Sequence, residues 1–260
     1  MASVRGPIRG RALAGVVLLI MTSGCYQADP LRRQRLERGC VLILTGVECY
    51  AAQHAGLARG LREGGEDRAI QIEEWGYKPF GTLPNLLSYQ LNRQRAAGLA
   101  ARLVKYRASY PEGEVTIIGF SGGGAMALFT AEALPADFQL DRIILLGAAV
   151  SPTYPLEGAL ARCKRGIVNF YSPYDWFMDG WATKTFGTMD RVKTDAAGRI
   201  GFRGADGEML KRDGLTQIKW RPAWRRLGHL GFHAGWRSRA WAREVLAAYV
   251  NAPVERIAQE

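Results

Sequence analysis

Six short apolar runs, rich in β-branched residues, recur along the chain with polar, helix-forming stretches between them. Continuous apolar runs of this kind are what a parallel β-sheet covered on both faces requires, because every side chain of such a strand is buried. The runs predict strands at residues 41–44, 69–75, 115–120, 142–146, 167–171 and 217–220.

The stretches between the runs carry helix signals. Residues 51–62 are followed by a Gly-Gly pair, which is a stop signal for a helix. Residues 85–110 have apolar positions near helical spacing, and Pro111 closes this long amphipathic helix. A last helix is expected from Ser238, its N-cap, to residue 250.

The alternation of strands and helices predicts one α/β domain over residues 40–252. We expect a doubly wound, mostly parallel sheet of about six strands in a three-layer αβα arrangement. A short linker at 25–39 precedes this domain, and a C-terminal tail at 253–260 follows it. Residues 179–216 are polar and glycine-rich, so we expect an excursion with a short hairpin above the strand ends.

Residues 1–24 have the pattern of an export signal. A basic leader with three arginines precedes an uncharged apolar stretch at 12–21, which is too short to span a bilayer comfortably. The small residues before Cys25 resemble the processing site of a bacterial lipoprotein, in which Cys25 is lipidated, although Thr22 stands where leucine is usual. An ordinary secretory peptide and an uncleaved anchor are the alternatives. Each predicts an exported protein, either periplasmic or membrane-anchored.

Charge narrows the choice of partner. The formal net charge of +11 falls to +8 when the three leader arginines are removed (11 − 3). The remaining arginines are scattered over nearly every predicted helix instead of clustering with aromatic residues on one element, which argues against nucleic-acid binding. Anionic lipid or polysaccharide is a better match for an exported basic protein.

Besides Cys25, the chain contains Cys40, Cys49 and Cys163. Export permits a disulfide, and three cysteines allow at most one pair, which the sequence does not choose. Buried free thiols are the default expectation. No Cys-x-x-Cys or Cys/His spacing is typical of a metal site, so we expect neither a metal nor a cofactor.

The third predicted strand runs directly into Gly119-Phe120-Ser121-Gly122-Gly123, and a helix is predicted from 125 to 134. Gly-x-Ser-x-Gly between a strand and a helix is typical of a nucleophile elbow, which exposes its serine at the end of a sheet. The flanking glycines allow the sharp turn, and the helix N-terminus stabilises negative charge beside Ser121. A turn that cradles phosphate is the alternative, but the lysine of a phosphate loop is missing.

Polar side chains follow later strands at the edge where ligands of parallel sheets bind. Asp175 follows the fifth strand, with Asp179 as an alternative acid, and His229 and His233 follow the sixth. A serine needs an imidazole to take its proton and a carboxylate to orient that imidazole. We predict a catalytic triad of Ser121, Asp175 and His233. His229 is the alternative base and otherwise a hydrogen-bond partner of the site; two structural histidines and an aspartate N-cap are the non-catalytic alternatives.

The predicted oxyanion hole uses the backbone N–H groups of Gly122 and Val47, the latter in the loop after the first strand. In the same region, Glu48 either lines the pocket or is solvated, and a structural role is expected for His54. Aromatic residues near the site suggest an apolar substrate pocket, or else simply pack the core: Tyr50, Trp176, Phe177, Trp181 and Phe186.

With these residues the chain resembles the α/β-hydrolase fold superfamily over about residues 40–252. The resemblance is carried by Leu44-Thr45-Gly46, the elbow, Asp175 and the loop Gly-His-x-Gly-x-His-x-Gly-Trp, which is similar to that of uncharacterised exported bacterial serine hydrolases. It implies eight strands in the order 1-2-4-3-5-6-7-8, of which this chain lacks the first antiparallel pair. It also implies hydrolysis, without choosing the substrate.

The leading functional hypothesis is an esterase- or lipase-like serine hydrolase that cleaves a carboxylic ester or lipid through an acyl-enzyme. A non-catalytic lipoprotein that uses the fold for binding, and an acyltransferase with the same triad, are the alternatives. The expected partner is a small-molecule ester or lipid, with membrane attachment through Cys25 and no nucleic acid.

Overall fold

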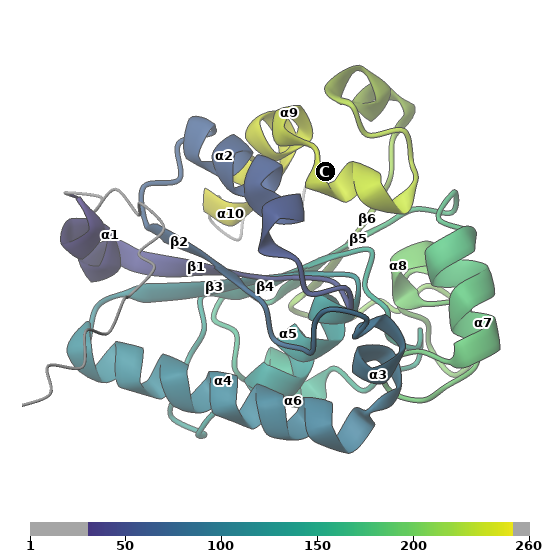
Figure 1. Cartoon of the computed structure of the whole chain (residues 1–260), viewed down its shortest axis with the longest axis horizontal. Coiled ribbons are helices and arrows are strands. Elements are labelled where there is room, and N and C mark those ends of the chain that lie inside the picture. Colours follow the sequence, from purple (N-terminus) through teal and green to yellow (C-terminus); the bar gives the residue numbers. More distant parts are fainter. Residues whose placement is uncertain (1–30, 252–260) are drawn as a thin grey trace, which may run out of the picture. The chain divides into compact units, whose positions relative to one another are not determined.

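The structure is a computed structural model that describes residues 31–251. The predicted export signal, Cys25 and the tail at 253–260 therefore lie outside the described residues. Within them, six strands form one all-parallel sheet in the order β2-β1-β3-β4-β5-β6 (Figure 1). The strands are β1 (Gly39–Leu44), β2 (Ala69–Glu73), β3 (Glu114–Phe120), β4 (Arg142–Leu146), β5 (Ile167–Tyr171) and β6 (Leu215–Lys219).

This strand order is the one that the family resemblance implies. Without its first two strands, the order 1-2-4-3-5-6-7-8 becomes 4-3-5-6-7-8, which is the observed order when β1 is counted as the third strand. No counterpart of the first antiparallel pair occurs within residues 31–251. The expectation of a doubly wound α/β sheet is confirmed.

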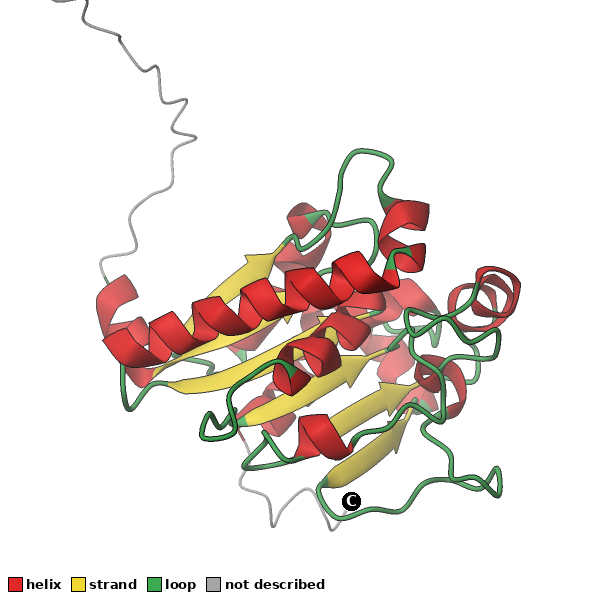
Figure 2. Ribbon diagram, turned by 90° about the horizontal axis from the view of Figure 1, so that it is seen from below, coloured by secondary structure: helices red, strands yellow, loops and turns green. Residues whose placement is uncertain are grey.

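Helices cover both faces of the sheet (Figures 1 and 2). One face carries α2 (Ala55–Glu63), α9 (Arg239–Trp241) and α10 (Ala247–Asn251), and the other carries α4 (Tyr89–Ser109), α5 (Gly122–Glu132) and α6 (Glu157–Leu160). Beyond the carboxyl ends of the strands lie α3 (Thr82–Leu87), α7 (Thr183–Phe186) and α8 (Ala197–Ile200). No helix in the described part of the chain is long and apolar enough to cross a membrane.

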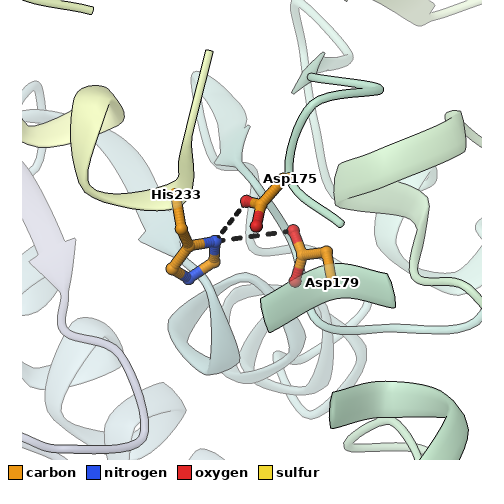
Figure 3. Close-up of side chains that lie close together, drawn as sticks. All are labelled: Asp175, Asp179 and His233. Atoms are coloured by element: carbon orange, nitrogen blue, oxygen red, sulfur yellow. Dashed lines mark hydrogen bonds and ion pairs between the residues drawn. The ribbon is translucent and has the colours of Figure 1, made fainter. Parts of the chain in front are cut away.

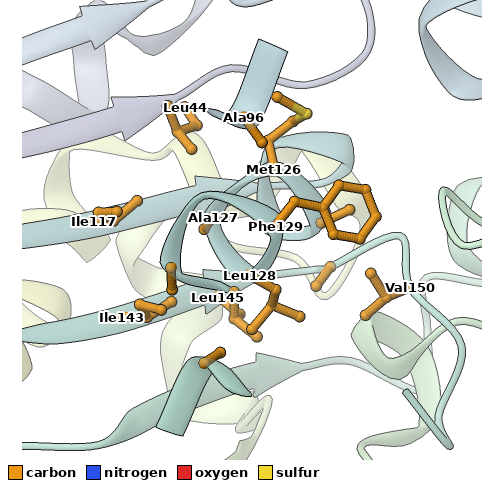
Figure 4. Close-up of a cluster of buried hydrophobic side chains, with 14 of the residues drawn as sticks. Leu44, Ala96, Ile117, Met126, Ala127, Leu128, Phe129, Ile143, Leu145 and Val150 are labelled. Atoms are coloured by element: carbon orange, nitrogen blue, oxygen red, sulfur yellow. The ribbon is translucent and has the colours of Figure 1, made fainter. Parts of the chain in front are cut away.

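The core is divided by the sheet into two hydrophobic clusters. Because side chains alternate along a strand, Val41 and Ile43 pack toward α2, whereas Leu42 and Leu44 pack toward α4 and α5. Ten of the eleven residues of α5 are buried, so it has no polar face and lies at the centre of its cluster (Figure 4). This burial holds the elbow that precedes α5 in place.

The region predicted as one helix at 85–110 consists of two helices, so that expectation was wrong. The helical conformation is interrupted at Ser88, between α3 and α4. Buried Asn85 explains the position of α3, because its Nδ2 donates to the carbonyls of Val47 (2.8 Å) and Tyr77 (2.9 Å). These contacts tie α3 to the loop after β1, which a helical pattern cannot reveal.

The other differences between the predicted and the observed elements are local. The arginine-rich segment predicted as a linker contains a short helix, α1 (Arg32–Arg38). The last helix begins after Ser238 as predicted, with the Ser238 side chain accepting from the N–H of Trp241, but it includes a π-helical turn, η5 (Ala242–Leu246). The excursion at 179–216 holds α7, α8 and one antiparallel bridge, Arg203 with Met209, in place of a full hairpin.

Candidate active site

Ser121 lies in a strained turn between the last residue of β3 and the first residue of α5. Its backbone has φ 54° and ψ −121°, a conformation that non-glycine residues rarely adopt. Neighbouring glycines make the turn possible: a β-carbon on Gly119 would lie 2.4 Å from the carbonyl oxygen of Gly123. A β-carbon on Gly123 would lie 2.3 Å from that of Leu44. The geometry is that of a nucleophile elbow.

Asp175 and His233 meet at the carboxyl edge of the sheet, although 58 residues separate them (Figure 3). Asp175 follows β5, and His233 begins the short turn η4 (His233–Arg237). The His233 Nδ1 lies 2.5 Å from Asp175 Oδ2, and the His233 Nε2 has no hydrogen-bond partner among the described residues. The imidazole packs on Phe120, with ring centroids 4.8 Å apart, and Phe120 immediately precedes Ser121. The structure thus brings the acid, the imidazole and the elbow together.

A second carboxylate lies beside the same imidazole. Asp179 Oδ2 is 3.7 Å from His233 Nδ1, and its side chain is 1% exposed. Asp179 belongs to a π-helical turn, η2 (Phe177–Ala182), a conformation that is rare and frequent at functional sites. The sequence offered Asp175 and Asp179 as alternatives, but the structure places both at the site.

Burial and the two carboxylates shift the proton affinities of this cluster. Burial and the neighbouring Asp175 raise the pKa of Asp179 well above its usual value, while His233 opposes the shift. Burial lowers the pKa of His233, but Asp175 and Asp179 outweigh that effect and raise it to about 9.

His229 lies away from the acids, in an aromatic cluster. Its ring is fully buried and lies 4.1 Å from that of Trp236, centroid to centroid, and Trp224 and Trp241 also pack against it. Its Nδ1 accepts a hydrogen bond from the N–H of Gly231 (3.2 Å), so its partner is loop backbone and neither Asp175 nor His233. A β-carbon on Gly235 would lie 2.2 Å from this Nδ1. His229 therefore supports the turn that carries His233.

Burial lowers the pKa of His229 to about 3. The unfolded chain binds a proton at this residue below the usual pKa of 6.5, whereas the folded protein does not until about 3. The stabilisation is therefore complete above pH 6.5 and is lost as the pH falls from 6.5 toward 3. From pH 7 to pH 5, we expect this group to reduce the free energy of unfolding by about 2 kcal/mol. Urea unfolding of the wild type and of His229→Phe at pH 7 and pH 5 measures this loss of stability. An equal pH dependence of the free energy of unfolding in both proteins would contradict the lowered pKa of His229.

The two predicted oxyanion-hole donors lie close together. The backbone nitrogen of Val47 is 3.4 Å from the point where a β-carbon on Gly122 would lie. Neither the N–H of Val47 nor that of Gly122 has an acceptor among the described residues. Val47 is held by the hydrogen bond from Asn85, a positioning residue that sequence reasoning missed. A lone asparagine among apolar helix positions was the only local sign in the sequence of this role for Asn85.

The remaining predicted residues near the site have structural partners. Glu48 Oε1 lies 3.3 Å from Nη1 of Arg237, so it is ion-paired. His54 is buried, and its ring packs edge-on against Phe120. Most of the aromatic residues expected near the site are exposed and do not pack the core; the side chain of Phe177 lies outside the described part. The exposed ones are Tyr50, Trp176, Trp181 and Phe186.

Asp175, Asp179 and His233 are also the one group in the described part of the chain whose acidic and imidazole atoms gather closely enough to consider a metal ion. Two ligands of one tetrahedral ion with bonds of about 2.0–2.1 Å lie about 3.3 Å apart. The 2.5 Å between His233 Nδ1 and Asp175 Oδ2 is a hydrogen-bond distance and does not fit such an ion.

The three cysteines in the described residues, Cys40, Cys49 and Cys163, are free thiols. Burial raises the pKa of Cys40 to about 11 and that of Cys163 to about 12. Thiols of such high pKa are poor nucleophiles at neutral pH, so neither Cys40 nor Cys163 is a candidate nucleophile.

No protein-family model matches the sequence, and no curated protein matches it. Among solved structures, it is similar to a dienelactone hydrolase-like promiscuous phosphotriesterase from metagenomic libraries (15% identity, TM-score 0.46, covering 85% of this chain and 87% of that one). It is also similar to a lipase-esterase related protein from Clostridium acetobutylicum (11% identity, TM-score 0.42, covering 85% of this chain and 96% of that one). A third similar structure is a Trichoderma reesei cutinase (13% identity, TM-score 0.38, covering 84% of this chain and 76% of that one). The strand order and the elbow, and not these distant similarities, define the α/β-hydrolase fold of this chain.

Proposed function

We propose that the protein is a serine hydrolase that cleaves a carboxylic ester through a covalent acyl-enzyme. The observation that carries this proposal is the pairing of His233 with Asp175 against Phe120, directly beside the strained turn of Ser121. A strained serine and a buried acid–imidazole pair each have a cost in stability, and their convergence at one edge of the sheet is typical of a catalytic site.

In the proposed reaction, Ser121 Oγ attacks the ester carbonyl carbon while His233 Nε2 takes the hydroxyl proton. Asp175 accepts a hydrogen bond from Nδ1–H of His233, which fixes the tautomer of the imidazole and stabilises the imidazolium. The N–H groups of Val47 and Gly122 donate to the oxyanion. When the tetrahedral intermediate collapses, His233 protonates the departing alcohol. Water then attacks the acyl-enzyme by the same steps and releases the acid.

Exposed aromatic side chains favour an apolar acyl group or a lipid as the substrate. Trp176 and Trp181 are 58% and 54% exposed, and Phe232, next to His233, is 55% exposed. They follow β5 and β6, so they lie at the same edge of the sheet as Asp175 and His233. Aromatic surface at this place binds apolar groups better than charged ones.

We further propose that the enzyme works outside the cytoplasm, attached to a membrane through a lipidated Cys25. This proposal is supported by the basic leader, the short apolar stretch and the small residues before the cysteine.

The direct test is covalent labelling with a fluorophosphonate, which reacts with activated serines. We expect one adduct on the folded protein, mapped by mass spectrometry to the peptide that contains Ser121, and none after heat denaturation. Activation by His233 and the oxyanion donors requires the folded site, which is why denaturation should abolish the reaction. A folded protein without an adduct at Ser121 would contradict the proposal and favour a binding role for the fold.

A further inference from the structure

The cluster at the site contains one carboxylate more than a triad needs. Asp175 Oδ2 and Asp179 Oδ2 lie 2.5 Å and 3.7 Å from His233 Nδ1, and the two side chains are 2% and 1% exposed. Two ionised carboxylates buried this close together repel each other and lose their hydration, so one of them is expected to keep a proton.

Asp179 lies in tight surroundings that offer its anion little compensation. A β-carbon on Gly198 would lie 2.2 Å from Asp179 Oδ2, and one on Gly147 would lie 3.3 Å from it, so two glycine backbones approach this oxygen closely. Oδ2 accepts no hydrogen bond from the described residues. A buried carboxylate oxygen without a donor is unfavourable when it is charged and tolerable when it is neutral.

The charged groups around Asp179 do not neutralise it. On the elements packed against its turn, Lys184 of α7 and Arg199 of α8 are both ion-paired with Asp195. Asp179 also faces His233 and Asp175. Glu48 acts electrostatically on His233 and is itself paired with Arg237. Asp179 thus faces one imidazole, which is already hydrogen-bonded to another carboxylate.

We propose that Asp179 is the protonated member of this cluster and stays a neutral acid at neutral pH, so that His233 faces a single carboxylate and remains free to act as a base. The inference rests on the proposed function, and it assigns Asp179 as a positioning residue that sets the charge of the triad. Its proton is not transferred: the proton of Ser121 still passes to His233 and then to the leaving group.

The alternative arrangement has the same total charge, with the proton on His233 and both carboxylates ionised. In that arrangement the imidazole is charged and could not accept the proton of Ser121. Asp175 and Asp179 both raise the pKa of His233, so a neutral Asp179 removes one of the two charges that hold a proton on the imidazole. Burial and the neighbouring Asp175 raise the pKa of Asp179, which is a shift in the direction of the first arrangement.

Infrared spectroscopy tests whether the proton is on Asp179 without relying on activity. Near pH 7, we expect the wild-type protein to show the carbonyl stretch of a protonated carboxyl group, and we expect Asp179→Asn to lose it. Asp195→Asn is the matched control: this neighbouring carboxylate is paired with Lys184 and Arg199, so its removal should leave the band unchanged. Absence of the band from the wild type near pH 7, or its survival in Asp179→Asn, would overturn the inference even if the enzyme proves active.

The pH dependence of fluorophosphonate labelling separates the two aspartates. Since asparagine resembles a neutral carboxyl, the acid limb of Ser121 labelling in Asp179→Asn should lie at the wild-type pH, whereas Asp175→Asn should lose about 10³–10⁴-fold in labelling rate. A loss of that size in Asp179→Asn, or an acid limb displaced downward by more than about one pH unit, would show that Asp179 is ionised in the wild type. The wild-type infrared measurement decides the matter if a variant does not fold.

Discussion

His233→Ala is expected to lower kcat for ester hydrolysis by about 10⁵–10⁶-fold. Two imidazoles in the described residues, those of His54 and His233, pack against Phe120, which precedes Ser121. Of these, His233 is the one whose Nδ1 pairs with a buried carboxylate, and its Nε2 has no hydrogen-bond partner within residues 31–251. Without it, the Ser121 hydroxyl keeps its proton and is a weak nucleophile. The measurement is kcat on a p-nitrophenyl ester, with Ser121→Ala defining the background rate.

His229→Phe is the matched control, because phenylalanine can occupy the aromatic cluster without an ionisable group. We expect it to retain kcat within about tenfold of the wild type, since His229 contacts Gly231 and the tryptophans and neither aspartate. The reverse ranking, with His229→Phe inactive and His233→Ala active, would refute the assignment of the base. Thermal unfolding of both variants distinguishes loss of chemistry from loss of fold.

Gly123→Ala is expected to destabilise the protein by about 4 kcal/mol or more. The added β-carbon would lie 2.3 Å from the carbonyl oxygen of Leu44 and 2.5 Å from that of Thr45, which are backbone atoms that no rotamer change can move. To relieve the clash, β1 and the elbow must separate. That separation would also displace Val47 from Gly122, so residual folded protein should label poorly at Ser121.

Gly98→Ala provides the control for this substitution. Gly98 lies inside α4 on an exposed position, and a β-carbon there meets nothing within 4 Å. Alanine has the better helix propensity, so we expect a gain of about 1 kcal/mol. Urea unfolding measures both variants. Wild-type stability of Gly123→Ala would show that β1 and the elbow can separate at little cost.

The strands and the elbow were predictable because their signals are local. Buried parallel strands need unbroken apolar runs, and the runs ending at Leu44, Phe120 and Tyr171 end strands in the structure. The break at Ser88 was not predictable, because the apolar spacing continues across it while Asn85 bonds to a loop 38 residues earlier in the chain. Helical periodicity records one face of a helix and not the tertiary contacts that end it.

By itself, the sequence determined the α/β class, the place of Ser121 at the end of β3, and the edge of the sheet to which the acids and histidines belong. These features depend on short-range patterns and on the rule that parallel strands end at one edge. Only the tertiary structure decided that His233 meets Asp175, that His229 enters the tryptophan cluster, and that Asp179 joins the site. Two residues four positions apart in one loop reach opposite surroundings because the turn at Gly231 redirects the chain, and a side chain's direction after such a turn depends on what packs around it.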